Sequence, residues 1–388
     1  MTLELASALV STGLASLGYI HLGIDGGWYN FDKDGLNASG YPTAPAGWDF
    51  PQLTSTLRSQ GLLLDMYVTG GMKTVYKHEA AWAAVMFGEW GASGVKVDHM
   101  CTVPECIIPG QAPGHQMAPA YQQATILRWV AGIAAVNATG RVLFQNCGVG
   151  CMPAAGNDTS GSPAPWADWC PATANLWRSS GDIAPVWGAI VGTNLASLAG
   201  RGGLAGPGGW NYADSLEIGN SRRGVQLTPG QARAHFSLWC VTSQPLFLGM
   251  DIRNITQDDL SVVSNPHAIA VDQAWAGFAG DMLNFSHYPP ADPQKNNYTV
   301  LPQGSVWWKP LPNGTAAAVL FNRGGGALNI SFRFQELVWG AIPRLANDSS
   351  SCSVFSVWDD RELGVFQGGF GGTVEGESCL FLLLRSCS

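Results

Sequence analysis

The sequence predicts a parallel (β/α)8 barrel over residues 1–285, followed by a small antiparallel β-sandwich domain over residues 286–388. Three observations lead to this division. Short apolar runs alternate with helical stretches up to about Gly280, which is typical of a parallel sheet. The stretch "HYPPADPQKNNY" is rich in Pro and Asn and is typical of a connector. After it come short strand-like runs separated by turns.

The barrel elements are expected in a regular order along the chain. About 280 residues of strand and helix suit an eight-stranded barrel, whose usual size is about 250 residues. A doubly wound open sheet is the alternative, and the lack of a dinucleotide-binding glycine fingerprint disfavours it. The expected strands are "YIHLGID", "LLLDMYV", "GVKVD" and "RVLFQNC", and the expected helices are "FPQLTSTLRSQG", "EAAWAAVMFGEWG", "PAYQQATILRWVAGIAAV" and "TPGQARAHFSLWCVTS".

The first residues predict an amphipathic helix, because Leu5, Leu9, Leu14 and Leu17 recur at helical spacing. The same stretch has no basic region of the kind that opens a secretory signal peptide. In the second domain, Asn313-Gly314 lies between two strand-like runs and predicts a hairpin. Further strands are expected at "ALNISFRF", "SVFSVWD", "LGVFQGG" and "CLFLLLR".

Composition excludes several classes of protein. Hydrophobic residues make up 46% of the chain and charged residues 12%, which excludes a disordered protein. A net charge of -8 argues against a nucleic-acid partner, which would require a basic face. No run of 18 apolar residues occurs, so no membrane span is expected. His99 and Cys101 lie close to Asp98 without zinc-ligand spacing, so neither a metal nor another cofactor is expected.

Two features indicate the secretory pathway, and hence a secreted or a lysosomal or vacuolar protein. Nine cysteines suit an oxidising compartment, and the odd count leaves at least one thiol unpaired, with Cys240 expected as a buried thiol. Nine sites fit the N-glycosylation pattern N-x-[ST]: Asn37, Asn137, Asn157, Asn254, Asn284, Asn297, Asn313, Asn329 and Asn347.

Three carboxylates fall at or just beyond candidate strand ends: Asp25, Asp98 and Asp182. Catalytic groups of parallel barrels occupy these ends, and two acids facing one bond is the arrangement of glycosidases. Lys96 lies on the same face of its strand as Asp98 and would keep that carboxyl ionised. Arg178 would hold Asp182 or a sugar hydroxyl. Each signal alone is weak: a lone Asp at a strand end is more often a turn or cap residue, and Lys96 with Asp98 could equally form a structural ion pair.

Together with their flanking residues, these stretches resemble the melibiase-type α-galactosidases, glycoside hydrolase family 27, over nearly the whole chain. "GYIHLGIDGGW" is similar to the family's G-Y-x-Y-x-N-I-D-D-C-W, and "GVKVD" to its nucleophile strand with K-Y-D or K-F-D. "LWRSSGDI" resembles S-W-R-T-T-G-D-I, which carries the acid/base. "GGWNYADSLEIGN" is similar to G-G-W-N-D-P-D-M-L-E-V-G-N, and "RAHFSLWCVTSQPLFLGMDIR" to R-x-H-F-S-L-W-A-L-x-x-A-P-L-L-I-G-x-D-x-R.

The resemblance implies a retaining exo-glycosidase that removes terminal α-D-galactosyl residues from carbohydrates. Asp98 would be the nucleophile and Asp182 the acid/base, with their carboxyls about 5–6 Å apart. A related α-N-acetylgalactosaminidase, a β-L-arabinopyranosidase and a non-catalytic sugar-binding relative stay open as alternatives. The residues implied in substrate binding are Asp25, Trp28, Tyr67, Lys96, Cys147, Arg178 and Asp214.

The sequence departs from the family pattern at several places. Gly26 replaces the second Asp of the tandem pair, which relaxes the expected preference for galactose. Gly27 and "YVTGGMKTV" lack two family cysteines, so two family disulfides are expected to be absent. The stretch "GVGCMPAAGNDTSG" differs from the family's C-E-W loop, which helps to choose the sugar. The family's first strand, with G-W-N-S-W, is expected to precede Met1.

Overall fold

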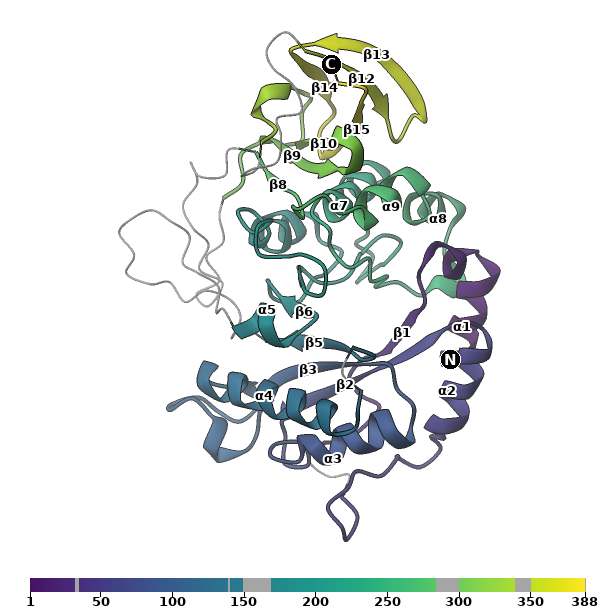
Figure 1. Ribbon diagram of the computed structural model, residues 1–388, viewed down its shortest axis with the longest axis vertical. Coiled ribbons are helices and arrows are strands. Elements are labelled where there is room, and N and C mark those ends of the chain that lie inside the picture. The colour runs from purple at the N-terminus through teal and green to yellow at the C-terminus, as the bar shows by residue number, and fades with distance from the viewer. Residues whose placement is uncertain (32–34, 139, 149–168, 284–299, 339–349, 388) are drawn as a thin grey trace. The chain divides into compact units, whose positions relative to one another are not determined.

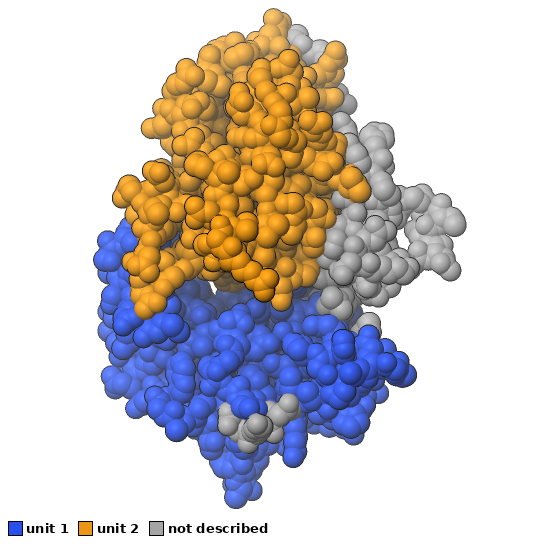
Figure 2. Space-filling model, turned by 180° about the vertical axis from the view of Figure 1, so that it is seen from behind, with its two compact units in different colours: residues 1–153, 165–178 blue, residues 154–164, 179–388 orange. Residues whose placement is uncertain are grey.

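The computed structural model of the protein describes residues 1–31, 35–138, 140–148, 169–283, 300–338 and 350–387. The chain divides into two units, coloured separately in Figure 2. Unit 1 comprises residues 1–153 and 165–178, and unit 2 comprises residues 154–164 and 179–388. The expected connector and the predicted boundary after residue 285 lie outside the described residues, so that boundary stays a prediction.

Unit 1 is built on a parallel half-barrel sheet of the (β/α)8-barrel type, the fold that the sequence predicts. Its parallel strands follow the chain order (Figure 1). They are β1 (His21–Ile24), β2 (Leu63–Gly71), β3 (Gly94–Cys101), β5 (Leu143–Cys147) and β6 (Leu176–Arg178). Between them lie α2 (Phe50–Ser59), α3 (Glu79–Ala83), α4 (Pro119–Ala135) and α5 (Trp169–Thr173). In Figure 1, α3 and α4 lie side by side along one face of this sheet.

The two faces of β3 explain why its sequence mixes apolar and charged residues. Val95 and Val97 are fully buried, whereas Lys96 and Asp98 are half-buried on the other face. In the register with β2, Lys96 lies beside Tyr67 and Asp98 beside Thr69. The register therefore lines up the polar side chains of neighbouring strands on one face of the sheet.

The N-terminal helix is shorter than the sequence predicts. Helix α1 spans Thr2–Ser11, and a separate 3₁₀ turn covers Leu14–Leu17. Gly13 separates them because it adopts a left-handed conformation with φ of 80°, which a continuous helix does not allow. A single amphipathic helix through Leu17 was the wrong prediction, although Leu9 and Leu14 are buried as its spacing implies.

Helix α2 begins and ends where local signals place it. The Asp49 carboxylate caps its N-terminus by accepting a hydrogen bond from the Gln52 N–H at 3.0 Å. Gly61, with φ of 75°, follows its C-terminus. Helix α3 continues without a break into a π-helical turn over Ala84–Glu89, so the predicted helical stretch is present with a locally wider backbone.

Unit 2 contains the remaining helices and the β domain. Its helices include α6 (Trp187–Ala189), α7 (Pro229–Val241), α8 (Gln257–Val263) and α9 (Pro266–Gln273), and its first strand is β7 (Trp210–Tyr212). A capping box formed by Thr228 and Gln231 begins α7. Within the described ranges, no helix has the length and apolar character needed to cross a membrane.

The β domain forms an antiparallel sandwich, as predicted. One sheet has the order β13-β12-β15-β10-β9-β8, and β11 pairs with β14 in the other. Asn313 and Gly314 both have positive φ and join β9 to β10, which confirms the predicted hairpin. The strands are β8 (Asp281–Met282), β9 (Gly304–Leu311), β10 (Thr315–Asn322), β11 (Leu328–Arg333), β12 (Ser351–Ser356), β13 (Arg361–Gln367), β14 (Gly369–Val374) and β15 (Ser378–Arg385).

Strand β14 has no counterpart in the sequence prediction. Its sequence "GFGGTV" is half glycine, whereas β-branched and aromatic residues are the usual strand signal. A Cβ atom at Gly372 would lie 2.9 Å from Leu380 Cδ1, which is closer than side chains normally pack. The glycines that make the strand hard to predict therefore also allow β14 to pack closely against Leu380.

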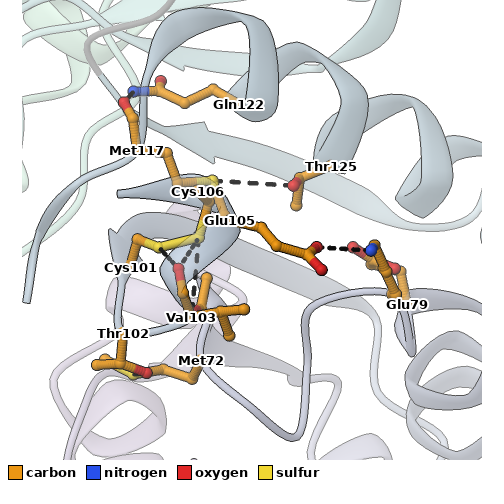
Figure 3. Close-up of a disulfide and its surroundings, with 12 residues drawn as sticks. Met72, Glu79, Cys101, Thr102, Val103, Glu105, Cys106, Met117, Gln122 and Thr125 are labelled. Carbon is orange, nitrogen blue, oxygen red and sulfur yellow. Dashed lines mark hydrogen bonds and ion pairs between the residues drawn. A yellow bond between two sulfur atoms is a disulfide. The ribbon is translucent and has the colours of Figure 1, made fainter. Parts of the chain in front are cut away.

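Cysteines stabilise each unit locally. Cys101–Cys106 forms a disulfide in unit 1 (Figure 3), and Cys352–Cys387 closes the β domain in unit 2. Cys240 is a fully buried thiol, as predicted, and burial raises its pKa well above the ordinary value.

An ion pair between the half-buried His21 and the buried Asp65 in unit 1 gives a prediction about stability. His21 Nδ1 lies 3.0 Å from Asp65 Oδ2. Burial lowers the pKa of His21, but the hydrogen bond and charge of Asp65 outweigh it and raise the pKa above its usual value. The pair's contribution is therefore complete below about pH 6.5 and is lost as the pH rises through the higher folded-state pKa.

We expect His21→Gln to reduce the free energy of unfolding more at about pH 5.5 than at about pH 8. Thermal unfolding of the variant and the wild type at both pH values measures this difference. The exposed His115, replaced by Gln, is the control and should change little at either pH. An equal loss of stability at the two pH values would contradict a protonated His21 in the folded state.

Candidate active site

Most of the polar residues singled out from the sequence lie toward the carboxyl ends of the unit 1 strands. Asp25 directly follows β1, Tyr67 lies in β2, Asp98 in β3, and Cys147 and Arg178 end β5 and β6. The register pairs Asp98 with Thr69 on one side and Cys147 on the other. This edge of a parallel barrel sheet is where enzymes of that fold carry their catalytic groups.

Both oxygens of the Asp98 carboxylate accept hydrogen bonds. Tyr67 Oη donates to Oδ2 at 2.8 Å, and the His99 backbone N–H donates to Oδ1 at 2.7 Å. Gln116 Nε2 also donates to Oδ1, at 3.3 Å. The carboxylate is therefore fixed in orientation by donors on both sides, as a nucleophile with one productive geometry requires.

Tyr67 is held as a hydrogen-bond donor. Burial, with the nearby Asp98 carboxylate, raises the pKa of Tyr67 far above its ordinary value, so the hydroxyl keeps its proton. Thr69 Oγ1 donates to Tyr67 Oη at 3.2 Å, which orients the hydroxyl further. The protonated hydroxyl of Tyr67 therefore donates its hydrogen bond to Asp98.

Lys96 is paired with Asp25 and not with Asp98, the carboxyl that it was expected to keep ionised. Lys96 Nζ lies 2.7 Å from Asp25 Oδ2 and 5.6 Å from the centre of the Tyr67 ring. Burial lowers the pKa of Lys96, but the sulfur of Cys147 and the Asp25 carboxylate outweigh burial and raise it. Burial by itself would raise the pKa of Asp25, but the charge and hydrogen bond of Lys96 outweigh burial, so the pKa of Asp25 lies below its usual value. Both groups are charged at neutral pH.

Arg178 and Cys147 also belong to this group within unit 1. The Arg178 side chain is only 3% exposed, and its Nη1 donates to Cys147 Sγ at 3.3 Å. A buried guanidinium provides fixed donors for an oxygen-rich ligand. The group thus combines two carboxylates, Asp25 and Asp98, with two cations, Lys96 and Arg178.

Trp28 occupies a supporting position. It is 7% exposed, and its indole N–H donates to the Tyr67 carbonyl oxygen at 2.9 Å. Its ring packs edge-to-face against aromatic neighbours, among them Phe50 and Trp82. These contacts fix the β2 segment that carries Tyr67; direct contact of Trp28 with a sugar stays a prediction.

Asp182 and Asp214 belong to unit 2. Asp214 Oδ2 accepts from the Ile183 backbone N–H at 2.9 Å, so Asp214 fixes the backbone next to Asp182. The Asp214 backbone has φ of 84°, and its carbonyl accepts from Trp239 Nε1 at 3.1 Å. Asp182 is exposed. The predicted spacing between the Asp98 and Asp182 carboxyls stays a prediction.

Gln116 is the member of the unit 1 group that sequence reasoning missed. It lies in the two-residue strand β4 (His115–Gln116), which pairs with β3. The surrounding residues "GHQMAP" show neither strand alternation nor a family motif, so nothing in them indicated its contact with Asp98.

Comparison with known proteins identifies the family. The sequence profile described as "Alpha galactosidase A" matches residues 1–274, and the profile "Alpha galactosidase C-terminal beta sandwich domain" matches residues 303–384. The chain therefore belongs to the α-galactosidase family of glycoside hydrolases.

One relative agrees with this assignment in sequence, and solved structures share the fold. The chain is 31% identical over 390 residues to alpha-galactosidase 3 of Arabidopsis thaliana, covering 98% of this chain and 76% of the relative. The crystal structure of alpha-galactosidase I from Mortierella vinacea shares the fold with a TM-score of 0.76, at 22% identity and covering 99% and 91% of the two chains. A β-L-arabinopyranosidase variant from Geobacillus stearothermophilus, solved with arabinose, has a TM-score of 0.71 at 16% identity, covering 100% and 94%.

The contact between Tyr67 and Asp98 gives a prediction about activity. Tyr67→Phe keeps the ring and removes the hydroxyl that donates to the carboxylate. A hydrogen bond to a charged group contributes roughly 1.5–3 kcal/mol, so kcat/KM should fall on the order of ten- to a hundredfold. Steady-state kinetics on an aryl glycoside measures the change. Tyr121→Phe, on the exposed face of α4, is the control, and an equal effect of both substitutions would contradict the assignment.

Proposed function

We propose that the protein hydrolyses terminal α-D-galactosides and retains the anomeric configuration. The observation that carries the proposal is the Asp98 carboxylate, held on both oxygens at the carboxyl end of β3 in a chain of the α-galactosidase family. The name of the relative from Arabidopsis thaliana supports a galactoside as substrate.

The proposed reaction has two displacements. Asp98 attacks the anomeric carbon while Asp182 protonates the glycosidic oxygen, so the leaving alcohol departs and a covalent glycosyl–enzyme ester forms. Asp182, now a carboxylate, takes a proton from water, and the resulting oxygen attacks the same carbon. The bond to Asp98 breaks, the sugar is released with its original configuration, and Asp182 has regained its proton.

The other proposed residues hold the reactants. Tyr67 and the His99 N–H orient the Asp98 carboxylate. The Asp25–Lys96 pair presents an anion and a cation to sugar hydroxyls, and Arg178 presents buried donors beside Cys147. In this proposal, Asp214 contributes to sugar binding and also fixes the backbone beside Asp182.

The choice of sugar is the finer part of the proposal. Structures related to this chain include a β-L-arabinopyranosidase, so the fold is compatible with more than one glycone. Gly26 leaves out the carboxylate that the family pattern places after Asp25. An α-N-acetylgalactosaminide and a β-L-arabinopyranoside are therefore the competing substrates, since pocket side chains choose the sugar. A non-catalytic relative is disfavoured because both carboxylates, Lys96 and Arg178 are retained.

We also propose a secretory location and a two-domain division at residue 285. Cys101–Cys106 and Cys352–Cys387 suit an oxidising compartment. The glycosylation sites that the structure describes are all exposed: Asn37, Asn137, Asn254, Asn313 and Asn329. The other four sites, Asn157, Asn284, Asn297 and Asn347, lie outside the described residues.

The proposed domain boundary is supported by the profile matches, the first of which ends at residue 274 and the second of which begins at residue 303.

A panel of chromogenic glycosides tests the proposed activity. We expect the 4-nitrophenyl α-D-galactoside to be hydrolysed with the highest kcat/KM, ahead of the α-N-acetylgalactosaminide and the β-L-arabinopyranoside. Proton NMR of the first-formed sugar should show the α-anomer. Asp98→Ala is the control and should be inactive on all three. A preference for another glycone would reject the galactoside, and first-formed β-galactose would reject retention.

Gly26 gives a sharper prediction about the glycone. A Cβ atom there would lie 3.5 Å from Tyr67 Cε1, an ordinary van der Waals contact, so the backbone accepts a side chain. We expect Gly26→Asp to raise kcat/KM for the α-galactoside on the order of ten- to a hundredfold, because the carboxylate would accept hydrogen bonds from the sugar. Gly26→Asn is the matched control for charge. An unchanged or lower value for the Asp variant would mean that the pocket is built for a different sugar.

A further inference from the structure

We propose that Gln116 is a positioning residue for Asp98, which it holds through its side-chain amide. The inference rests on the proposed role of Asp98 as the nucleophile. Gln116 Nε2 donates to Asp98 Oδ1 at 3.3 Å, while Tyr67 Oη donates to Oδ2 at 2.8 Å. Donors on the two oxygens restrict rotation of the carboxylate about its Cβ–Cγ bond.

The strand geometry explains how Gln116 reaches Asp98. Strands β3 and β4 are antiparallel, with Met100 opposite Gln116 and Cys101 opposite His115. Asp98 lies two residues before Met100, so it projects from the same face. Gln116 is therefore the diagonal cross-strand neighbour of Asp98, a distance that a long side chain spans.

The backbone of Gln116 is fixed from both sides. The N–H of Met117 donates to the His99 carbonyl at 2.7 Å, and Gln122 Nε2 donates to the Met117 carbonyl at 2.8 Å. At the other end of the hairpin, the Gly114 N–H donates to the Cys101 carbonyl at 2.7 Å. Figure 3 shows Met117 and Gln122 near the Cys101–Cys106 disulfide, which closes the loop after β3.

The chemistry of the amide fixes its orientation. An ionised carboxylate only accepts hydrogen bonds, so the nitrogen of Gln116, not its oxygen, must face Asp98. Gln116 Oε1 is then buried with no hydrogen-bond partner among the residues that the structure describes. A buried oxygen without a partner costs stability. For stabilising the hairpin alone, this buried amide is unfavourable, because its oxygen has no partner among the residues that the structure describes. For holding Asp98 it is favourable, because its nitrogen donates to the carboxylate.

The test compares Gln116→Leu and Gln116→Glu with the wild type. Leucine removes the donor, and glutamate keeps the shape but puts a second carboxyl beside Asp98. Losing a hydrogen bond to the ionised form should move the acidic limb of the kcat/KM–pH profile upward by about one pH unit for Leu, and further for Glu. At the pH optimum, kcat/KM should fall about tenfold for Leu.

His115→Leu is the matched control, because His115 is the exposed neighbour in β4 and its side chain lies on the opposite face of the strand. This variant should keep the wild-type pH profile. If Gln116 only stabilises the hairpin, Gln116→Leu will lower the melting temperature or the rate while the acidic limb stays in place. That result would overturn the proposal.

A second measurement keeps the inference separate from the proposed activity. Carboxyl carbon NMR of protein labelled at aspartate follows the titration of Asp98 directly, and Asp98→Asn assigns its signal. The midpoint should move upward in Gln116→Leu, whether or not any glycoside is hydrolysed. An unchanged midpoint would reject the role of Gln116, whereas inactivity of the wild type with a shifted midpoint would reject only the proposed reaction.

Discussion

The hydrogen bond between Tyr67 and Asp98 is the contact on which the rest of the candidate site depends. It exists because the β2–β3 register sets Tyr67 beside Lys96 and Thr69 beside Asp98 on one face of the sheet. The buried Val95 and Val97 on the other face hold that register, because a slip by one residue would exchange the two faces. Trp28 supports the same segment through the Tyr67 carbonyl. The packing of the core thus determines the direction of the carboxylate.

The groups that donate hydrogen bonds to the Asp98 carboxylate are all neutral, and the nearby cations have other partners. Lys96 is engaged by Asp25, and Arg178 donates to Cys147, whereas Tyr67, Gln116 and a backbone N–H contact Asp98. Neutral donors orient a carboxylate without neutralising it by a direct ion pair, which would reduce its nucleophilicity. In the proposed reaction the nearby cations are left to act on the sugar, whose hydroxyls would accept hydrogen bonds from them.

The sequence predicted the parts of the structure that local signals determine. The four strands of unit 1 with clear apolar runs and the Asn313-Gly314 hairpin were predicted, since apolar patterning and turn residues specify them. The break at Gly13 and the strand β14 were missed, because glycine conformation and close strand packing depend on tertiary contacts. The same limit applied within the site. Asp25 was recognised by motif, but its pairing with Lys96 and the contact of Gln116 with Asp98 arise from neighbouring strands.

Trapping of the covalent intermediate tests the central claim most directly. A 2-deoxy-2,2-difluoro-α-galactoside with a trinitrophenyl leaving group slows both steps, but the good leaving group lets the first one proceed, so a glycosyl–enzyme accumulates. Peptide mass spectrometry then identifies the modified residue. The account predicts one added sugar on the peptide that contains "GVKVDHM", attached to Asp98. A sugar attached to any other carboxylate, or steady turnover of the natural substrate class with no trapped ester, would contradict it.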